Sequence, residues 1–138
     1  MDEMNEMIVK DNTELTVFGD VNTLPVIKMF DGSTLPIEQI INIVNGETKS
    51  VSEVLNQVLD LQGFGGCIME AHDDATGETV KYKKYFIVTD VGIVSTTSIF
   101  IGRTLQMLYR CNVQTMHIKF RQVEKQGKRH FYLDLVTD

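Results

Sequence analysis

Three lysines, two tyrosines and a phenylalanine crowd into the eight residues of KYKKYFIV, at positions 81–88. Alternate side chains of a strand point to opposite faces, so Lys81, Lys83 and Tyr85 are expected on one face. Ammonium groups neutralise phosphates, and tyrosine rings stack on unpaired bases with little regard to sequence. The stretch therefore predicts a surface for single-stranded nucleic acid. Solubility lysines beside half-buried tyrosines are the alternative explanation of the same pattern.

A second basic and aromatic stretch lies near the end of the chain. Residues 115–123 and 129–136 alternate strictly between apolar and polar types around EKQGK, which predicts a hairpin with Gly127 in its loop. The predicted core face holds Met116, Ile118, Phe120, Phe131, Leu133 and Leu135. The predicted solvent face holds His117, Lys119, Arg121, His130, Tyr132 and Asp134.

Together the two stretches define a candidate binding surface. Lys81, Lys83, Lys119, Arg121, Lys128 and Arg129 are expected to contact phosphates, with Lys125 extending the charge at the loop. Tyr85 and Tyr132 are expected to stack on bases, with Tyr82 and Lys84 as second choices. Arg103 and Arg110 lie on a predicted helix and are also second choices, with simple solvation as their alternative.

The charge of the chain is divided unevenly along its length. The formal net charge is -6, yet residues 1–70 carry 3 Lys/Arg against 12 Asp/Glu, whereas residues 71–138 carry 10 against 7. Salt screens charges beyond about 10 Å at 0.1 M, so a basic surface persists within an acidic chain. The acidic total therefore does not exclude a nucleic-acid partner.

Signatures of catalysis and of cofactor binding are weak. The chain has no GxxxxGK[ST], HExxH or CxxC motif, and GFGG at 63–66 lacks the strand and helix of a nucleotide fingerprint. His72 beside Asp73 and Asp74 could bind a metal, but an exposed turn explains these residues better. We therefore expect no enzyme, no cofactor and no metal site.

Length, composition and cysteine usage favour one globular domain, or one domain plus an arm, in the cytoplasm. Hydrophobic residues make up 43% and charged residues 23%. No apolar run approaches the roughly 18 residues that span a bilayer, and no signal peptide is evident. Cys67 and Cys111 are expected to be reduced, buried thiols, with a disulfide between them as the less favoured alternative.

The first half of the chain gives the weaker structural predictions. Residues 1–12 are predicted to form a mobile tail, 14–18 a short strand, and 37–46 a short helix after a turn at 30–36. Residues 48–66 fit both a helical and a strand period, and the valines and flanking glycines favour strand. The glycines of GFGG predict a bend or bulge.

The second half is clearer. Residues 67–72 and 80–90 are predicted strands around a turn at 73–78, followed by a turn at Asp90-Val91-Gly92. Thr97 or Ser98 is expected to cap a helix that reaches residue 110. About five strands, with one helix before the last hairpin, predict a mainly β fold of the OB-type Greek-key barrel class.

The segment from Gly77 onward resembles the small single-stranded DNA-binding proteins of Firmicutes phages and conjugative plasmids. The residues that carry the resemblance are TGETVKYKKYFIVTDVGIVSTTS, then IFIGRTLQMLYR, then HIKFRQVEKQGKRHFYLDLV. NGETKSVSEVLNQVLDLQ also looks like the first barrel strand of that family. The resemblance covers roughly residues 46–137, and its motifs are loose patterns.

The resemblance implies an OB-type domain over 46–138. Residues 1–45 depart from the family pattern, and we expect them to form an acidic N-terminal arm or extension. It implies sequence-tolerant binding of single-stranded DNA, with RNA as a second ligand, during replication or transfer of a mobile element. Coating a long strand requires neighbouring copies, so a homo-oligomer is expected. The alternative is a protein-interaction module, such as a phage-encoded inhibitor, that docks through its acidic half without nucleic acid.

Overall fold

The computed structural model describes residues 8–9, 25–111 and 116–136, and within them one sheet of eight strands. The strands are β1 (Ile8–Val9), β2 (Val26–Met29), β3 (Lys49–Ser50), β4 (Leu59–His72), β5 (Thr79–Thr89), β6 (Gly92–Thr96), β7 (Met116–Lys125) and β8 (Lys128–Val136). The helices are α2 (Ile37–Val44), the short 3-10 helix η1 (Val51–Val54) and α3 (Ile99–Arg110). The fold is mainly β, as predicted, with three short additional strands from the first 50 residues.

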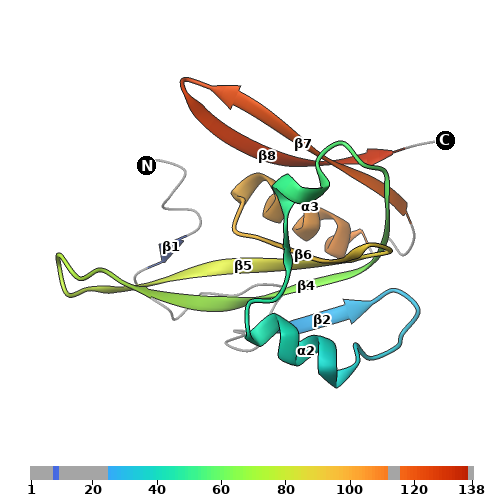
Figure 1. The fold of residues 1–138 in the computed structure, drawn as a ribbon, viewed down its shortest axis with the longest axis horizontal. Helices are drawn as coiled ribbons and strands as arrows, with labels where there is room; N and C mark the ends of the chain where they lie inside the picture. Colours follow the sequence, from blue (N-terminus) through green and yellow to red (C-terminus); the bar gives the residue numbers. More distant parts are fainter. Residues whose placement is uncertain (1–7, 10–24, 112–115, 137–138) are drawn as a thin grey trace.

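The strands follow the order β3-β6-β5-β4-β7-β8, with β1 beside β5 and β2 beside β4. Among these pairings only β3–β6 is parallel. The sheet curls into a half-barrel (Figure 1). The bend lies in β4, whose register shifts between Leu61 and Gly63 as its neighbour changes from β7 to β2. The bulge predicted at GFGG therefore lies one residue earlier, at Gln62, whereas Gly63 to Gly66 pair with β5 in regular register.

Helix α3 lies inside the curl, between the β7–β8 hairpin and strands β5 and β6 (Figure 1). Ser98 caps it, since the Ile101 N–H donates to Ser98 Oγ at 3.3 Å. Ile101, Leu105 and Leu108 form one buried face, as predicted from their spacing. We call the cluster that they form with Ile118 and other buried residues of the sheet the barrel core.

Helix α2 lies on the opposite side of β4 and β5 (Figure 1). Leu35 and Ile43 pack there with Phe86 and Val88 in a second core. Since alternate residues of β5 enter the two cores, both of its faces are covered at its C-terminal end. The predicted helix at 37–46 is confirmed, and part of the predicted N-terminal arm is built into the sheet.

The segment between α2 and β4 differs from its predicted strand. After the two residues of β3 the chain forms η1, and Val51 and Val54 are both buried, one helical turn apart. The Ser50 N–H donates to Glu53 Oε2 at 2.6 Å, which closes the start of this turn. The continuous strand face predicted from Lys49 to Leu61 is therefore wrong over η1, where a local cap holds a helical turn.

The N-terminal predictions are tested only in part. Strand β1 pairs with Lys81 and Tyr82 of β5, so the mobile tail predicted for residues 1–12 is wrong at residues 8–9, where backbone pairing fixes the chain. The rest of that tail and the strand predicted at 14–18 lie outside the described residues.

The two cysteines are free thiols in different environments. Cys67 is buried, as predicted, and burial raises the pKa of its thiol. Cys111 is exposed, against the prediction, because it lies at the C-cap of α3 on the surface.

None of the helices in the described ranges combines the length and the apolar character that crossing a bilayer would require.

Candidate nucleic-acid interface

Strand β5 was expected to show one basic and aromatic row to solvent. Instead every residue from Tyr85 to Thr89 is buried, because α3 covers one face and α2 the other. Only the N-terminal half of β5, which holds Lys81 to Lys84, keeps partial exposure. Alternation correctly predicted which β5 side chains share a face of the strand. It did not predict that α3 and α2 cover the two faces.

Tyr85 is a core residue and cannot offer its ring to a base. It is 5% exposed, and its ring lies so close to Gly102 of α3 that a Cβ there would overlap it. Burial raises the pKa of Tyr85 to about 12, and Gln106 Nε2 donates to its hydroxyl at 3.5 Å. The predicted stacking role of Tyr85 is therefore wrong, because α3 seals this row.

The lysines of β5 are also poorly placed for a shared surface. Lys81 Nζ lies 3.7 Å from Glu70 Oε1, and the half-buried Lys83 has its pKa lowered by desolvation. These two share the row of Tyr85, whereas Tyr82 and Lys84 lie on the opposite face. The β5 cations are thus divided between two faces, and one of them has an acidic partner.

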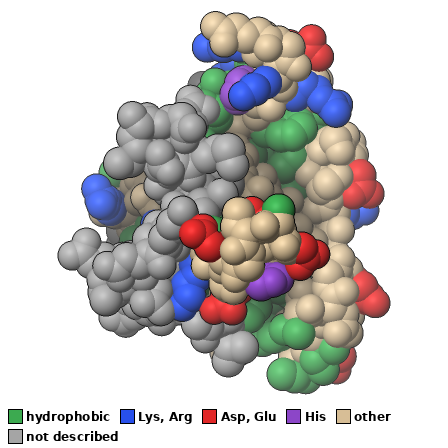
Figure 2. All heavy atoms as spheres, turned by 90° about the vertical axis from the view of Figure 1, so that its left-hand side faces the viewer, with side chains coloured by type: hydrophobic (Ala, Val, Ile, Leu, Met, Phe, Trp, Pro, Cys, Tyr) green, Lys and Arg blue, Asp and Glu red, His purple; other side chains and the backbone are tan. Residues whose placement is uncertain are grey.

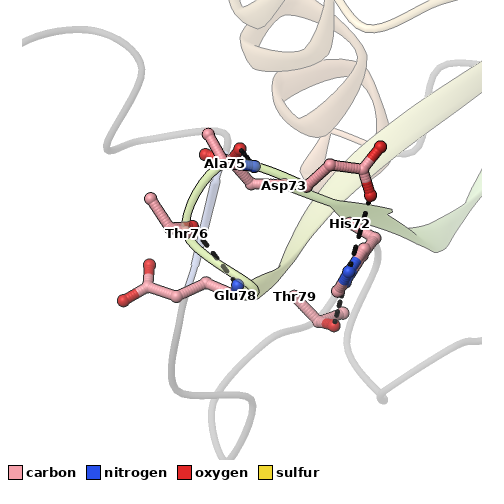
Figure 3. A network of polar contacts seen from close by, with 7 residues as sticks. His72, Asp73, Ala75, Thr76, Glu78 and Thr79 are labelled. Carbon is pink, nitrogen blue, oxygen red and sulfur yellow. Dashed lines mark hydrogen bonds and ion pairs between the residues drawn. The ribbon is translucent and has the colours of Figure 1, made fainter.

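The tip of the β4–β5 hairpin is acidic. Residues 70–80 hold Glu70, Asp73, Asp74 and Glu78 and no Lys or Arg. The turn is held by its own polar groups (Figure 3): the Ala75 N–H donates to Asp73 Oδ1 at 2.9 Å, and the Glu78 N–H donates to Thr76 Oγ1 at 3.2 Å. The charge of this tip opposes phosphate binding.

The same turn accounts for the histidine and aspartates considered as metal ligands. His72 Nδ1 lies 3.4 Å from Thr79 Oγ1, and its Nε2 lies 3.7 Å from Asp74 Oδ1 (Figure 3). Asp73 is engaged with the backbone of the turn. Over the part of the chain that the structure describes, no three His, Cys, Asp or Glu side chains are grouped to hold a metal.

The β7–β8 hairpin is formed as the sequence predicts. Its two-residue turn, Gln126-Gly127, has positive φ at both positions, 53° and 77°, which suits the twist of the flanking strands. Ile118, Phe120 and Leu133 are buried in the barrel core, as predicted. Leu135 is the exception at 50% exposure, because it lies near the end of β8.

The outer face of this hairpin carries an ordered stack of side chains, which we call the column. The Arg121 guanidinium lies over the Tyr132 ring, 4.7 Å from its centroid. The Tyr132 ring stacks on Phe100 of α3 at 4.7 Å between centroids and 30° between planes. Asp134 accepts from Arg121 Nε at 2.8 Å and from its Nη2 at 3.3 Å, which raises the pKa of Arg121.

Phe100 extends the column with two further neighbours. His130 meets its ring edge-on at 5.4 Å between centroids, and the Arg103 guanidinium lies 6.0 Å from its centroid. Sequence reasoning missed Phe100, His130 and Asp134 as members of a site. The hairpin alternation placed His130 and Asp134 on the correct face, whereas Phe100 gave no signal because its partners are some 30 residues away.

Cations surround the column and continue to the hairpin tip. Lys125, Lys128 and Arg129 are exposed at the tip, Glu124 is the acid beside them, and Lys119 is half-buried on the outer face. In Figure 2 this hairpin, at the top, shows Lys and Arg side chains with a histidine and, at its edge, a carboxylate, whereas carboxylates and a histidine gather at the lower centre. The two hairpin tips thus carry opposite charge.

The structure therefore separates the predicted residues into two groups. Lys81 and Lys83 belong to the row that faces the barrel core, whereas Arg121 and Tyr132 lie on the face turned away from it. The single surface predicted from three strands is wrong, because the row of Lys81 and Lys83 lies on the inner face of the sheet and the row of Arg121 and Tyr132 on its outer face. One group, on β7, β8 and the start of α3, remains as the candidate interface.

A cleft of about 430 Å³ adjoins this interface, between β8 and the end of β6. Its lining is rich in hydroxyl groups, from Ser50, Ser52, Ser95, Thr96, Thr97 and Ser98, and includes Arg129 and Phe131. Ser98 Oγ donates to the Phe131 carbonyl at 2.9 Å, which ties α3 to the edge of β8. The cleft thus follows the seam where the half-barrel stays open.

Comparison of the chain with protein-family models, with curated proteins and with solved structures finds no match in any of the three.

Proposed function

We propose that this protein binds single-stranded DNA without sequence preference, through the outer face of the β7–β8 hairpin. The observation that carries the proposal is the column of Arg121, Tyr132 and Phe100 beside the exposed cations of the hairpin tip. Cations near a phosphate backbone release counterions, and stacked planar groups bind any base. The proposed function is non-catalytic and needs no cofactor.

We further propose that the half-barrel is of the OB-type Greek-key class. Support comes from the order β6-β5-β4-β7-β8, with α3 between β6 and β7 and a seam between β6 and β8. Proteins of that architecture commonly bind oligonucleotides, which agrees with the resemblance of residues 77–136. The same resemblance leads us to propose a cytoplasmic role in coating DNA of a mobile element, with RNA as a second ligand.

The test is fluorescence anisotropy with labelled oligo-dT across a salt series, beside a duplex of equal length. The proposal requires tighter binding of the single strand and a steep loss of affinity as salt rises. An absence of binding at low salt would remove the proposal. Coating also requires contacts between copies, so sedimentation of the protein with a long strand is expected to show strand-length assemblies.

A second candidate function rests on the acidic tip of the β4–β5 hairpin. Glu70, Asp73, Asp74 and Glu78 form an acidic projection that suits a basic protein partner, and backbone hydrogen bonds close its turn. Under this alternative the protein docks without nucleic acid, as an inhibitor or adaptor. The anisotropy experiment separates the two functions, because only the first predicts salt-sensitive binding of oligo-dT.

A further inference from the structure

Tyr132 does not present a free ring to solvent. Arg121 approaches it from β7, whereas Phe100 approaches from the other side of β8, where Ser98 bonds to the Phe131 carbonyl. Both neighbours lie 4.7 Å from the Tyr132 centroid. A base that reaches the column from the β7 side therefore meets a guanidinium before it meets an aromatic ring.

The guanidinium is held in place by a second residue. Arg121 is opposite Tyr132 in the strand register, and Asp134 is opposite Lys119, so the carboxylate lies one diagonal step away. Its two contacts with Arg121, at 2.8 and 3.3 Å, draw the side chain across the ring. The Arg121 side chain is still 47% exposed, so a ligand can reach it.

We infer that an unpaired base of the bound strand stacks on the guanidinium of Arg121, with Asp134 as the residue that positions it. The inference rests on the proposed function and specifies its base-contacting site. A guanidinium is planar and stacks on rings from both sides, which a lysine ammonium cannot do. The base would become the outermost member of the column, beyond Arg121, Tyr132 and Phe100.

The competing arrangement is one in which the base displaces Arg121 and stacks directly on Tyr132. The two arrangements give Asp134 opposite roles. If the base stacks on Arg121, removal of the Asp134 charge disorders the platform and weakens the base contact. If the base displaces Arg121, removal of that charge frees Tyr132 and strengthens the contact.

The experiment compares oligo-dT with an abasic oligonucleotide of the same length and phosphate number. The ratio of the two affinities isolates the contribution of the bases, because the phosphate contacts are common to both. For Arg121→Lys we expect the ratio to fall about tenfold while abasic binding stays unchanged. Arg129→Lys is the matched control, since the exposed Arg129 has no ring contact among the described residues.

Asp134→Asn is the second variant in this experiment. Removal of the negative charge is expected to tighten abasic binding a few-fold, while the ratio falls. Glu124→Gln makes the same charge change at the exposed end of β7 and is expected to tighten both ligands equally. Thermal unfolding of each variant checks that the hairpin stays folded.

The outcomes separate the inference from the proposed function. If Arg121→Lys keeps the wild-type ratio, or if Asp134→Asn raises it, the inference is overturned although the protein still binds DNA. If the wild-type protein binds neither oligonucleotide, the proposed function falls and the inference falls with it. A lowered ratio in both variants, with both controls unchanged in ratio, supports the inference.

Discussion

The two long hairpins of this protein use similar residues in different ways. Both β4–β5 and β7–β8 combine cations with aromatic rings in their sequences. In β5 the ring of Tyr85 is sealed under α3 and Lys81 has an acidic neighbour, whereas in β8 the ring of Tyr132 supports an exposed arginine. Of the two hairpins, β7–β8 is the one in which a stacked arginine and tyrosine lie on an exposed face.

The difference shows what an alternating pattern can and cannot decide. Alternation determines which side chains share a face of a strand. Whether that face is open depends on elements from elsewhere, here α3 on one side of β5 and α2 on the other. Similar composition therefore gives β5 a helix on each face, whereas the outer face of the β7–β8 hairpin stays exposed.

The strongest test of this comparison is the replacement of Tyr85 by alanine. Loss of a fully buried ring is expected to lower the free energy of unfolding by about 3–5 kcal/mol, because a cavity remains under Gly102. Tyr82→Ala in the same strand, at a half-buried position, is the matched control and should cost clearly less. Urea unfolding measures both, and equal losses would contradict the proposed burial of Tyr85.

Removing the cations of one hairpin tip should affect DNA binding far more than removing those of β5. A variant with serine at Lys125, Lys128 and Arg129 is expected to lose about a hundredfold in affinity for oligo-dT at 0.1 M salt. Its salt slope should fall by about 2, since each single-strand phosphate contact contributes about 0.7.

Lys81→Ala is the comparison for that variant. Because Lys81 Nζ lies near Glu70, its loss should change the salt slope by less than about 0.7. Anisotropy titrations across a salt series measure both slopes. A larger change for Lys81→Ala than for the tip variant would reverse the comparison between the hairpins.

Alkaline pH should destabilise the fold through Tyr85. Its pKa is raised from 10.0 to about 12 by burial, so the neutral hydroxyl is favoured in the folded state. This stability is fully present below pH 10 and is lost as pH rises to 12, by about 3 kcal/mol. Unfolding of wild type and Tyr85→Phe across this window measures it, and equal slopes would exclude Tyr85 as the cause.

The smallest expected effect concerns the two hairpin turns. Gly77 and Gly127 both have positive φ, 75° and 77°, and a Cβ at either position would meet nothing within 4 Å. Alanine at each is therefore expected to cost only about 1–2 kcal/mol, from backbone strain alone. Thermal unfolding of both variants tests this, and a much larger cost at one turn would reveal a difference between the hairpins.

Several elements could be predicted because local signals agreed with one another. The β7–β8 hairpin follows from strict alternation around Gly127, and α3 follows from Ser98 and the spacing of Ile101, Leu105 and Leu108. The turn at 73–78 follows from its glycine and aspartates. In each case the residues that decide the structure are neighbours in sequence.

The failures come from contacts that are distant in sequence or from competing local signals. The cover over β5 comes from residues 35–43 and 101–108, which no pattern within β5 reveals. Phe100 joins the column through partners on β8. At η1 the sequence fits both periods, and the hydrogen bond between Ser50 and Glu53 favours the helical turn over the strand.

The second core has a consequence for dissecting the chain. Strand β2 runs so close to β4 that a side chain at Gly65 would overlap the Val26 carbonyl, and Leu35 and Ile43 shield Phe86 and Val88. A fragment trimmed to residues 46–138 would expose the apolar side chains of Phe86 and Val88 and the unpaired edge of β4. We expect such a fragment to aggregate. We therefore expect the shortest fragment that folds by itself to begin no later than Val26.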